Sequence, residues 1–141
     1  MSTDRRRRGP AVTFEWITEK STGVRYPFIP VFLERGEHRL PEVGMLLDTG
    51  ADTSVLPLEL TGLLGLHASD LRKTKTAGIG GAAAAWRATK AGIVGRIGIY
   101  DVQFPDVQFI ANVVPILGRD ALFGRFELRM NRDEIEIREI R

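Results

Sequence analysis

Hydrophobic and polar side chains alternate along several stretches of the chain. Val12, Phe14 and Trp16 are separated by single polar residues, a period of two that is typical of a strand with one buried face. The same alternation recurs in residues 24–28, 93–99, 107–113, 126–130 and 135–137. The pattern therefore predicts an all-β protein, in which few segments are left for helices.

Other segments break this alternation. Residues 40–47 form a largely apolar run that predicts a buried strand. Residues 57–66 predict a short helix or an irregular packed turn, and a short helix is also expected at residues 119–123. Residues 71–76 and 82–87 predict the two strands of a hairpin, with a cluster of glycines at its tip.

The chain is expected to end in a second hairpin. Residues 126–130 and 135–137 alternate on either side of Asn131-Arg132-Asp133, a sequence that favours a turn. Apolar strands at a terminus leave an open sheet edge unless a partner covers it. We therefore expect a second copy of the chain to cover these strands.

Length and charge indicate one domain with a basic N-terminal tail. The sequence has 141 residues and no cysteine, which suits a single domain without a disulfide framework. Residues 1–10 contain four Arg and one Asp, a net charge of +3, so the remainder of a chain with total charge +2 carries −1. We expect a flexible basic tail at residues 1–10 and one domain at residues 11–141.

The arginines at positions 5–8 offer a contact for nucleic acid or for an acidic membrane surface. A short charge run is more often a solvated tail, and the rest of the chain lacks a basic patch with interleaved aromatic residues. No stretch has a signal-peptide core or enough apolar length to span a bilayer. We expect a cytoplasmic protein with neither a membrane partner nor a nucleic-acid partner.

Candidate chemistry centres on Asp48, which follows the apolar run of residues 40–47. Gly50 has the conformational freedom to reverse the chain sharply, so Asp48 is expected to lie low in a cleft. The alternative is that Asp48-Thr49-Gly50 is an ordinary turn, in which Asp and Gly are both common. His38 and His67 lack the spacing of metal ligands, so we expect neither a metal nor a cofactor.

The longer sequence around Asp48 resembles the catalytic motif of the retroviral-type aspartic proteases, or retropepsins. In residues 45–56 two leucines precede Asp-Thr-Gly-Ala-Asp, and a Val-Leu pair follows. Ala-Gly-Ile-Gly-Gly at residues 77–81 resembles the tip of the family's flap, and Ile-Leu-Gly-Arg-Asp at residues 116–120 resembles its motif at the C-terminal helix. The resemblance implies the acid-protease fold, a closed β-barrel or sandwich with one short C-terminal helix.

The resemblance also implies a role for each matched residue. Asp48, Thr49 and Gly50 would form the catalytic loop, with Thr49 bonding across a two-fold axis. Asp52 would bind the substrate backbone and pair with Arg119, for which the alternative is an unpaired surface cation. The other expected substrate-binding residues are Ala51, Val55, Gly78, Ile79, Gly80, Val114 and Ile116, and Gly118 is expected to support the structure. The apolar members of this set have core packing as their alternative role.

Catalysis by this family needs two aspartates, whereas the chain has one Asp-Thr-Gly and no internal repeat. The pair must then come from two copies that meet at a two-fold axis. We expect a homodimeric aspartic endopeptidase that cuts extended peptide or protein substrates. The alternative is a dimeric module with the same fold that binds peptides without cutting them.

Overall fold

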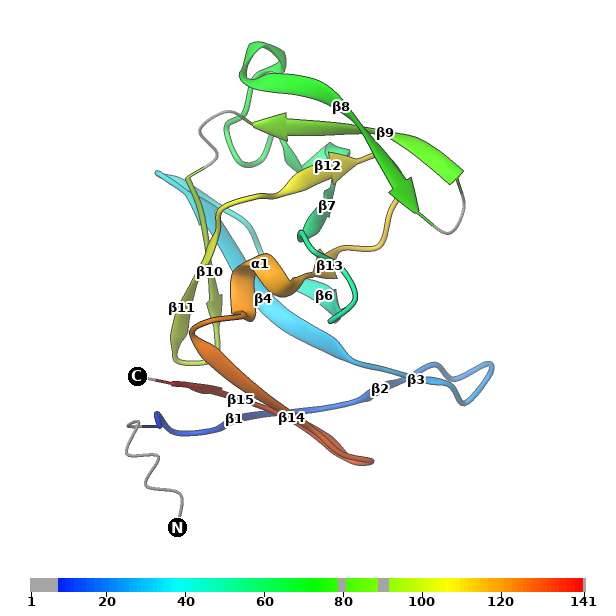
Figure 1. Cartoon of the computed structure of the whole chain (residues 1–141), viewed down its shortest axis with the longest axis vertical. Coiled ribbons are helices and arrows are strands. Elements are labelled where there is room, and N and C mark those ends of the chain that lie inside the picture. Colours follow the sequence, from blue (N-terminus) through cyan, green and yellow to red (C-terminus); the bar gives the residue numbers. More distant parts are fainter. Residues whose placement is uncertain (1–7, 79–80, 89–91, 141) are drawn as a thin grey trace.

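The computed structural model describes residues 8–78, 81–88 and 92–140 (Figure 1). Almost all the regular structure in these residues is β. The strands are β1 (Val12–Glu15), β2 (Ile17–Thr18), β3 (Arg25–Tyr26), β4 (Phe28–Arg35), β5 (His38–Arg39), β6 (Val43–Leu47), β7 (Val55–Pro57), β8 (Leu71–Gly78), β9 (Gly81–Ala88), β10 (Ile93–Ile97), β11 (Tyr100–Phe104), β12 (Gln108–Ile110), β13 (Ile116–Leu117), β14 (Phe126–Met130) and β15 (Glu134–Glu139). The helices are the 3-10 helices η1 (Leu58–Leu60) and η2 (Ala68–Asp70) and the α-helix α1 (Arg119–Leu122). The prediction of an all-β protein with one short helix near the C-terminus is confirmed.

The strands form three sheets. The largest has the order β11-β10-β4-β6-β13-β7-β12-β9-β8, with β5 paired to β4; the second has the order β1-β15-β14, and β2 pairs with β3 in the third. The order of the largest sheet is an open path from β11 to β8. The strand pairings of the described residues therefore do not form the closed barrel that we expected.

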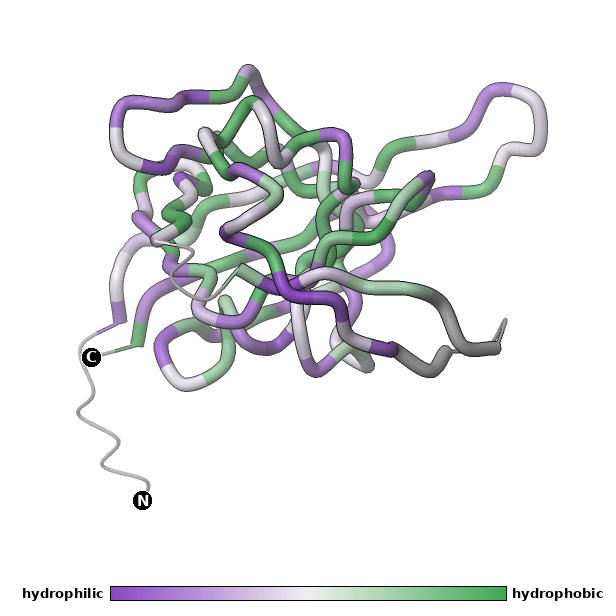
Figure 2. Tube along the Cα trace, turned by 90° about the horizontal axis from the view of Figure 1, so that it is seen from above, coloured by the Kyte–Doolittle hydropathy of each residue, from purple (hydrophilic) through white to green (hydrophobic). Residues whose placement is uncertain are grey.

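The core lies between the sheets and follows from the alternation in the sequence. Ile29, Val31 and Leu33 of β4 are at most 1% exposed, and Met45 of β6 is fully buried. Hydrophobic stretches run through the middle of the molecule, and many hydrophilic stretches lie on the loops at its rim (Figure 2).

Among the residues described, no helix has both the length and the apolar character needed to cross a membrane.

Several strands were not predicted, among them β5, β7, β11 and β13. The alternation in residues 93–99 predicts a single strand, whereas β10 ends at Ile97 and the chain returns as β11. Gly98 makes the reversal with a φ of 58°, a left-handed conformation that favours glycine. Ile99 continues the apolar alternation but is 63% exposed in this turn, so the pattern alone does not reveal the reversal.

The N-terminal boundary differs from our expectation of a flexible tail over residues 1–10. Arg8 forms a bridge with Ile140, and the Gly9 N–H donates to the Glu139 carbonyl at 2.8 Å. The Tyr100 hydroxyl donates to the carbonyl of Pro10 at 2.6 Å. Residues 8–10 are therefore attached to the domain, and residues 1–7 lie outside the described part of the chain.

The C-terminal hairpin is present as β14 and β15. β15 is the central strand of its three-stranded sheet, so it has no open edge. β15 pairs with β14 on one side and with β1 on the other, so that Ile137 lies opposite both Val12 and Leu128. Ile137 is fully buried within the single chain. The open edges of this sheet are β14 and β1, and β15 needs no partner chain to cover it.

The contacts of residues 8–10 generate a prediction about truncation. Removing residues 1–10 should lower the free energy of unfolding by about 1–3 kcal/mol relative to removing residues 1–7, because two hydrogen bonds of about 0.5–1.5 kcal/mol each are lost. Denaturant unfolding of the two shortened chains measures this difference. Equal free energies of unfolding would contradict the attachment of residues 8–10.

Candidate active site

Asp48 lies at the end of a strand that is paired on both sides. β6 is antiparallel to β4 and parallel to β13, with Leu47 opposite Leu117. The Asp48 N–H donates to the Leu117 carbonyl at 3.0 Å, and the Leu47 N–H donates to the Pro27 carbonyl at 2.9 Å. Backbone bonds to two other segments therefore fix the position from which the Asp48 side chain extends.

The loop after Asp48 is a tight turn around its carboxylate. The Gly50 N–H donates to Asp48 Oδ1 at 2.9 Å, and the Ala51 N–H donates to the Asp48 carbonyl at 3.2 Å. A Cβ at Gly50 would lie 3.2 Å from the same Oδ1. Asp48 is half-buried, whereas Thr49 and Gly50 are exposed. One side-chain oxygen of Asp48 is thus held by the turn, at a surface that a partner can approach.

Helix α1 is joined to this loop by backbone and side-chain contacts. The Arg119 N–H donates to the Ala51 carbonyl at 2.9 Å. The Arg119 side chain forms the predicted ion pair with Asp52, whose side chain is 81% exposed. An exposed pair contributes little stability, so we assign this contact the role of orienting Asp52 and the loop.

Gly118 allows the helix to begin against the loop. A Cβ at this position would lie 2.6 Å from the carbonyl carbon of Thr53 and 2.9 Å from the nitrogen of Ser54. Both atoms belong to the backbone, which cannot move aside as a flexible side chain can. The structural role expected for Gly118 therefore has a steric cause, since a larger residue would push α1 away from the loop.

Sequence reasoning missed the buried pair of Ser54 and Asp120. Ser54 is fully buried, and its Oγ donates to Asp120 Oδ1 at 2.7 Å and accepts from the Gly118 N–H at 3.0 Å. The Ser54 N–H also donates to Asp120 Oδ1, at 2.8 Å. Burial raises the pKa of the Asp120 carboxyl above its ordinary value of 3.8, and the hydrogen bonds from Ser54 oppose this rise. The two residues are 66 positions apart, so no local pattern reveals their contact.

Some residues predicted to line the cleft share one face of the sheet. Ile116 lies opposite Leu46 on one side and opposite Val55 on the other, and all three are half-buried. Ala51 is half-buried in the loop after Asp48, and Val114 is 51% exposed. This face therefore presents an apolar surface next to Asp48.

The hairpin expected to act as a flap is formed by β8 and β9. The two strands are paired from Leu71 opposite Ala88 to Gly78 opposite Gly81, and β12 joins β9 to β7 in the same sheet. Gly78 thus ends β8, whereas Ile79 and Gly80 lie outside the described residues.

Three surface hollows of the described residues lie away from Asp48. One of about 480 Å³ is lined by β4, β10 and neighbouring residues, including Phe32 and Arg96. Hollows of about 340 and 250 Å³ are lined by residues near Pro105. None of these three hollows is lined by Asp48.

The buried Asp120 gives a prediction for the dependence of stability on pH. Because its pKa is higher in the folded chain, Asp120 binds its proton more tightly there than in the unfolded chain. The associated stability is present at low pH and is lost as the pH rises from about 3.8 through the raised pKa. Asp120→Asn keeps an oxygen acceptor for Ser54 and cannot ionise, so it does not lose this stability. The free energy of unfolding of the variant minus that of the native chain should therefore increase between about pH 4 and pH 7.

Urea unfolding over this pH range measures the difference, with Asp101→Asn as the control. The Asp101 side chain is 73% exposed in a surface ion pair with Arg96. Its substitution should give a nearly constant difference. A difference for Asp120→Asn that is flat or decreases with pH would contradict the effect of burial.

Comparison with known proteins places this site in a family. The solved structure of a retropepsin-like aspartic protease from Rickettsia conorii aligns over 99% of this chain and 98% of its own, with a TM-score of 0.63 and 18% sequence identity. EIAV protease, solved as a complex with the inhibitor HBY-793, aligns over 74% of this chain and 89% of its own, with a TM-score of 0.48 and 25% identity. No curated protein matches the sequence.

The sequence model of the aspartyl protease family matches residues 36–125, which are 90 of the 141 residues. The matched region contains the Asp48 loop, β8, β9 and α1. The likeness to the Rickettsia conorii structure shows that the fold is shared over nearly the whole chain. The chain therefore belongs to the aspartyl protease family and has a retropepsin-like fold.

Proposed function

We propose that the chain is an aspartic endopeptidase that works as a homodimer and hydrolyses peptide bonds in extended polypeptides. The observation that carries the proposal is the Asp48 carboxylate at the end of β6, held by the Gly50 N–H at 2.9 Å in a chain of the aspartyl protease family. The sequence has one such loop, so the second carboxylate comes from a second copy of the chain.

In the proposed dimer the two Asp48 carboxyl groups lie a few ångströms apart and share one proton, because two charges at that distance repel. The ionised Asp48 takes a proton from a water between them, while the protonated one donates to the oxygen of the scissile carbonyl. The water oxygen bonds to the carbonyl carbon and gives a tetrahedral diol. The pair then protonates the leaving nitrogen as the C–N bond breaks, which releases a carboxylic acid and an amine.

The neighbouring loop residues are proposed to hold the two chains and the substrate. Thr49 is exposed beside Asp48, where it can bond across the two-fold axis. The Gly50 carbonyl and Asp52 would bind the substrate backbone, with Asp52 oriented by its ion pair with Arg119. These contacts would hold a substrate in the extended form of an added strand.

Substrate side chains are proposed to fit against the apolar face beside Asp48. Val55 and Ile116 form a cross-strand pair on this face, and Ala51 and Val114 are proposed to extend it. Residues flanking the cut bond should therefore be apolar. Gly78, Ile79 and Gly80 are proposed to cover the peptide from the other side, since glycine lets backbone approach a ligand closely.

The proposal predicts that Asp48→Asn abolishes cleavage and keeps the fold. The amide preserves the shape and can still accept the Gly50 N–H, but it cannot share a proton, so cleavage should fall by about 10²–10⁴-fold. Cleavage of a peptide library over a range of pH measures this loss, and denaturant unfolding checks the fold. Asp101→Asn is the matched control, because it makes the same chemical change at an exposed side chain that pairs with Arg96. Cleavage by the folded Asp48→Asn variant at the native rate would refute the proposed function.

A further inference from the structure

A hairpin near the N-terminus, residues 17–26, stands apart from the two larger sheets. It consists of β2 and β3, which pair with each other and with no other strand of the described residues. Its turn is closed by bonds from the Glu19 N–H to the Val24 carbonyl and from the Gly23 N–H to the Glu19 carbonyl, both at 2.8 Å. We call this hairpin the arm; it projects from the body at the lower right of Figure 1.

The arm extends beyond the level of the catalytic loop. Phe28 lies opposite Leu46 in an antiparallel pair, so the chain from Phe28 back into the arm runs in the same direction as the chain from Leu46 to Asp48. Tyr26, two residues from Phe28, then comes level with Asp48. The turn of the arm lies at least four residues farther, which is roughly 13 Å in an extended strand.

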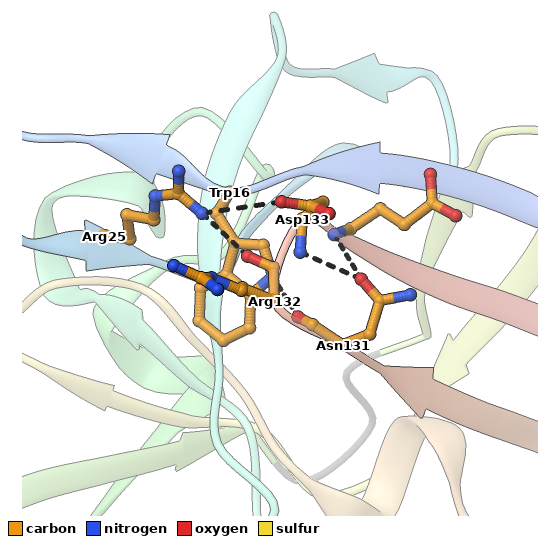
Figure 3. A network of polar contacts seen from close by, with 6 residues as sticks. Trp16, Arg25, Asn131, Arg132 and Asp133 are labelled. Carbon is orange, nitrogen blue, oxygen red and sulfur yellow. Dashed lines mark hydrogen bonds and ion pairs between the residues drawn. The ribbon is translucent and has the colours of Figure 1, made fainter.

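One face of the arm is fixed to the turn between β14 and β15 (Figure 3). The Trp16 Nε1–H donates to the Asn131 carbonyl at 3.0 Å. Arg25 donates from Nη1 to the Arg132 carbonyl at 2.7 Å and forms an ion pair with Asp133 at 4.0 Å. These contacts hold the arm in one position, so that it would lose little conformational entropy on binding a partner.

The Asn131 side chain makes the support for the arm rigid. Its Oδ1 accepts from the N–H groups of Asp133 and Glu134, each at 2.9 Å, and so closes the turn that contacts Trp16 and Arg25. The arm and the terminal sheet therefore form one unit, although 107 positions separate Arg25 from Arg132.

The opposite face of the arm is apolar and uncovered in the single chain. Ile17 is paired with Tyr26, and Val24 lies two residues before Tyr26, so the three side chains share the face opposite Arg25. Ile17 is 53% exposed and Val24 is 45% exposed. The Tyr26 ring is 6.1 Å from the ring of Phe28.

This apolar face continues to the wall of the cleft. Phe28 lies opposite Leu46, and Leu46 lies opposite Ile116, so these side chains share one face of the large sheet. All three are half-buried. The apolar surface thus runs from the arm to the residues beside Asp48, where the proposed function places the partner chain.

The area needed for a stable dimer indicates what covers the arm. A stable interface buries about 800 Å² on each partner and involves about 20–30 residues a side. The four residues 48–51 are too few to supply this area. The charges of the arm also balance, because Glu19 and Lys20 have opposite signs and Arg25 is paired with Asp133, so two copies do not repel each other.

We propose that the arm docks on the second copy of this chain, with the Ile17 and Val24 side chains packed against the partner. The inference rests on the proposed function, because two Asp48 carboxylates can meet only if the partner lies on the side toward which the arm extends. By two-fold symmetry each chain contributes one arm and receives one, so each substitution in the arm acts twice in the dimer.

Ile17→Asp tests the proposal, with Ile99→Asp as the matched control. Ile99 is 63% exposed in the turn between β10 and β11, on the other side of the molecule in Figure 1. Ile17→Asp should raise the dimer dissociation constant by at least about tenfold, because it places two charges in the interface, whereas Ile99→Asp should leave the constant unchanged. Sedimentation over a dilution series measures both. Equal dissociation constants for the two variants would overturn the proposal.

A second measurement uses single cysteines, which the native chain lacks. The alkylation rate of Val24→Cys should fall as the protein concentration rises through the dissociation constant, because the partner covers the arm. The rate for Ile99→Cys should stay constant. A Val24→Cys rate that does not change with concentration would contradict docking, even if Ile17→Asp failed to fold.

These results distinguish failure of this inference from failure of the proposed function. If Ile17→Asp weakens the dimer but the Asp48→Asn variant still cleaves peptides, the docking of the arm would be supported and the shared catalytic site would be refuted. If cleavage depends on Asp48 but Ile17→Asp does not change the dimer dissociation constant, the shared site would be supported and the docking of the arm would be refuted. A native chain that stays monomeric at all concentrations would refute both.

Discussion

The close approach of two backbone segments, Gly118 against Thr53 and Ser54, is the contact on which the rest of the site depends. A Cβ at Gly118 would lie 2.6 Å from the Thr53 backbone, so the absence of a side chain lets α1 begin directly against the loop after Asp48. The buried Ser54 then bonds to both Gly118 and Asp120. This joins the loop that follows Asp48 to the start of α1, beside the strand that carries the half-buried Asp48.

Local patterns predicted much of this architecture. Alternation identified many of the strands because it reflects burial of one face, and the apolar run before Asp48 marked a strand inside the sheet, whereas short strands such as β5, β7 and β13 show no such pattern. The pattern did not show where the chain reverses, as at Gly98, because an exposed Ile99 preserves the alternation. It also gave no sign that Ser54 meets Asp120, since that contact arises from the pairing of distant strands.

Charge and polarity were poorer guides at the chain ends. The basic composition of residues 1–10 predicts a solvated tail, yet the backbone groups of Gly9 and Pro10 make hydrogen bonds to the domain, which charge does not reveal. The apolar C-terminal strand predicts an edge in need of a partner, but β1 of the same chain occupies it. The arm also carries exposed apolar side chains, but Ile17 and Val24 are too few to stand out as a pattern in the sequence.

The central claim is that one catalytic site requires an Asp48 from each of two chains. Mixing native chains with an equal amount of Asp48→Asn chains, at fixed total concentration and with time for subunit exchange, tests this directly. If a dimer works only with both carboxyl groups, random pairing leaves about one quarter of the dimers active, and the cleavage rate should fall to about one quarter of that of the native protein. A rate of about one half, in proportion to the native chains present, would show that each chain acts by itself and would contradict the shared site.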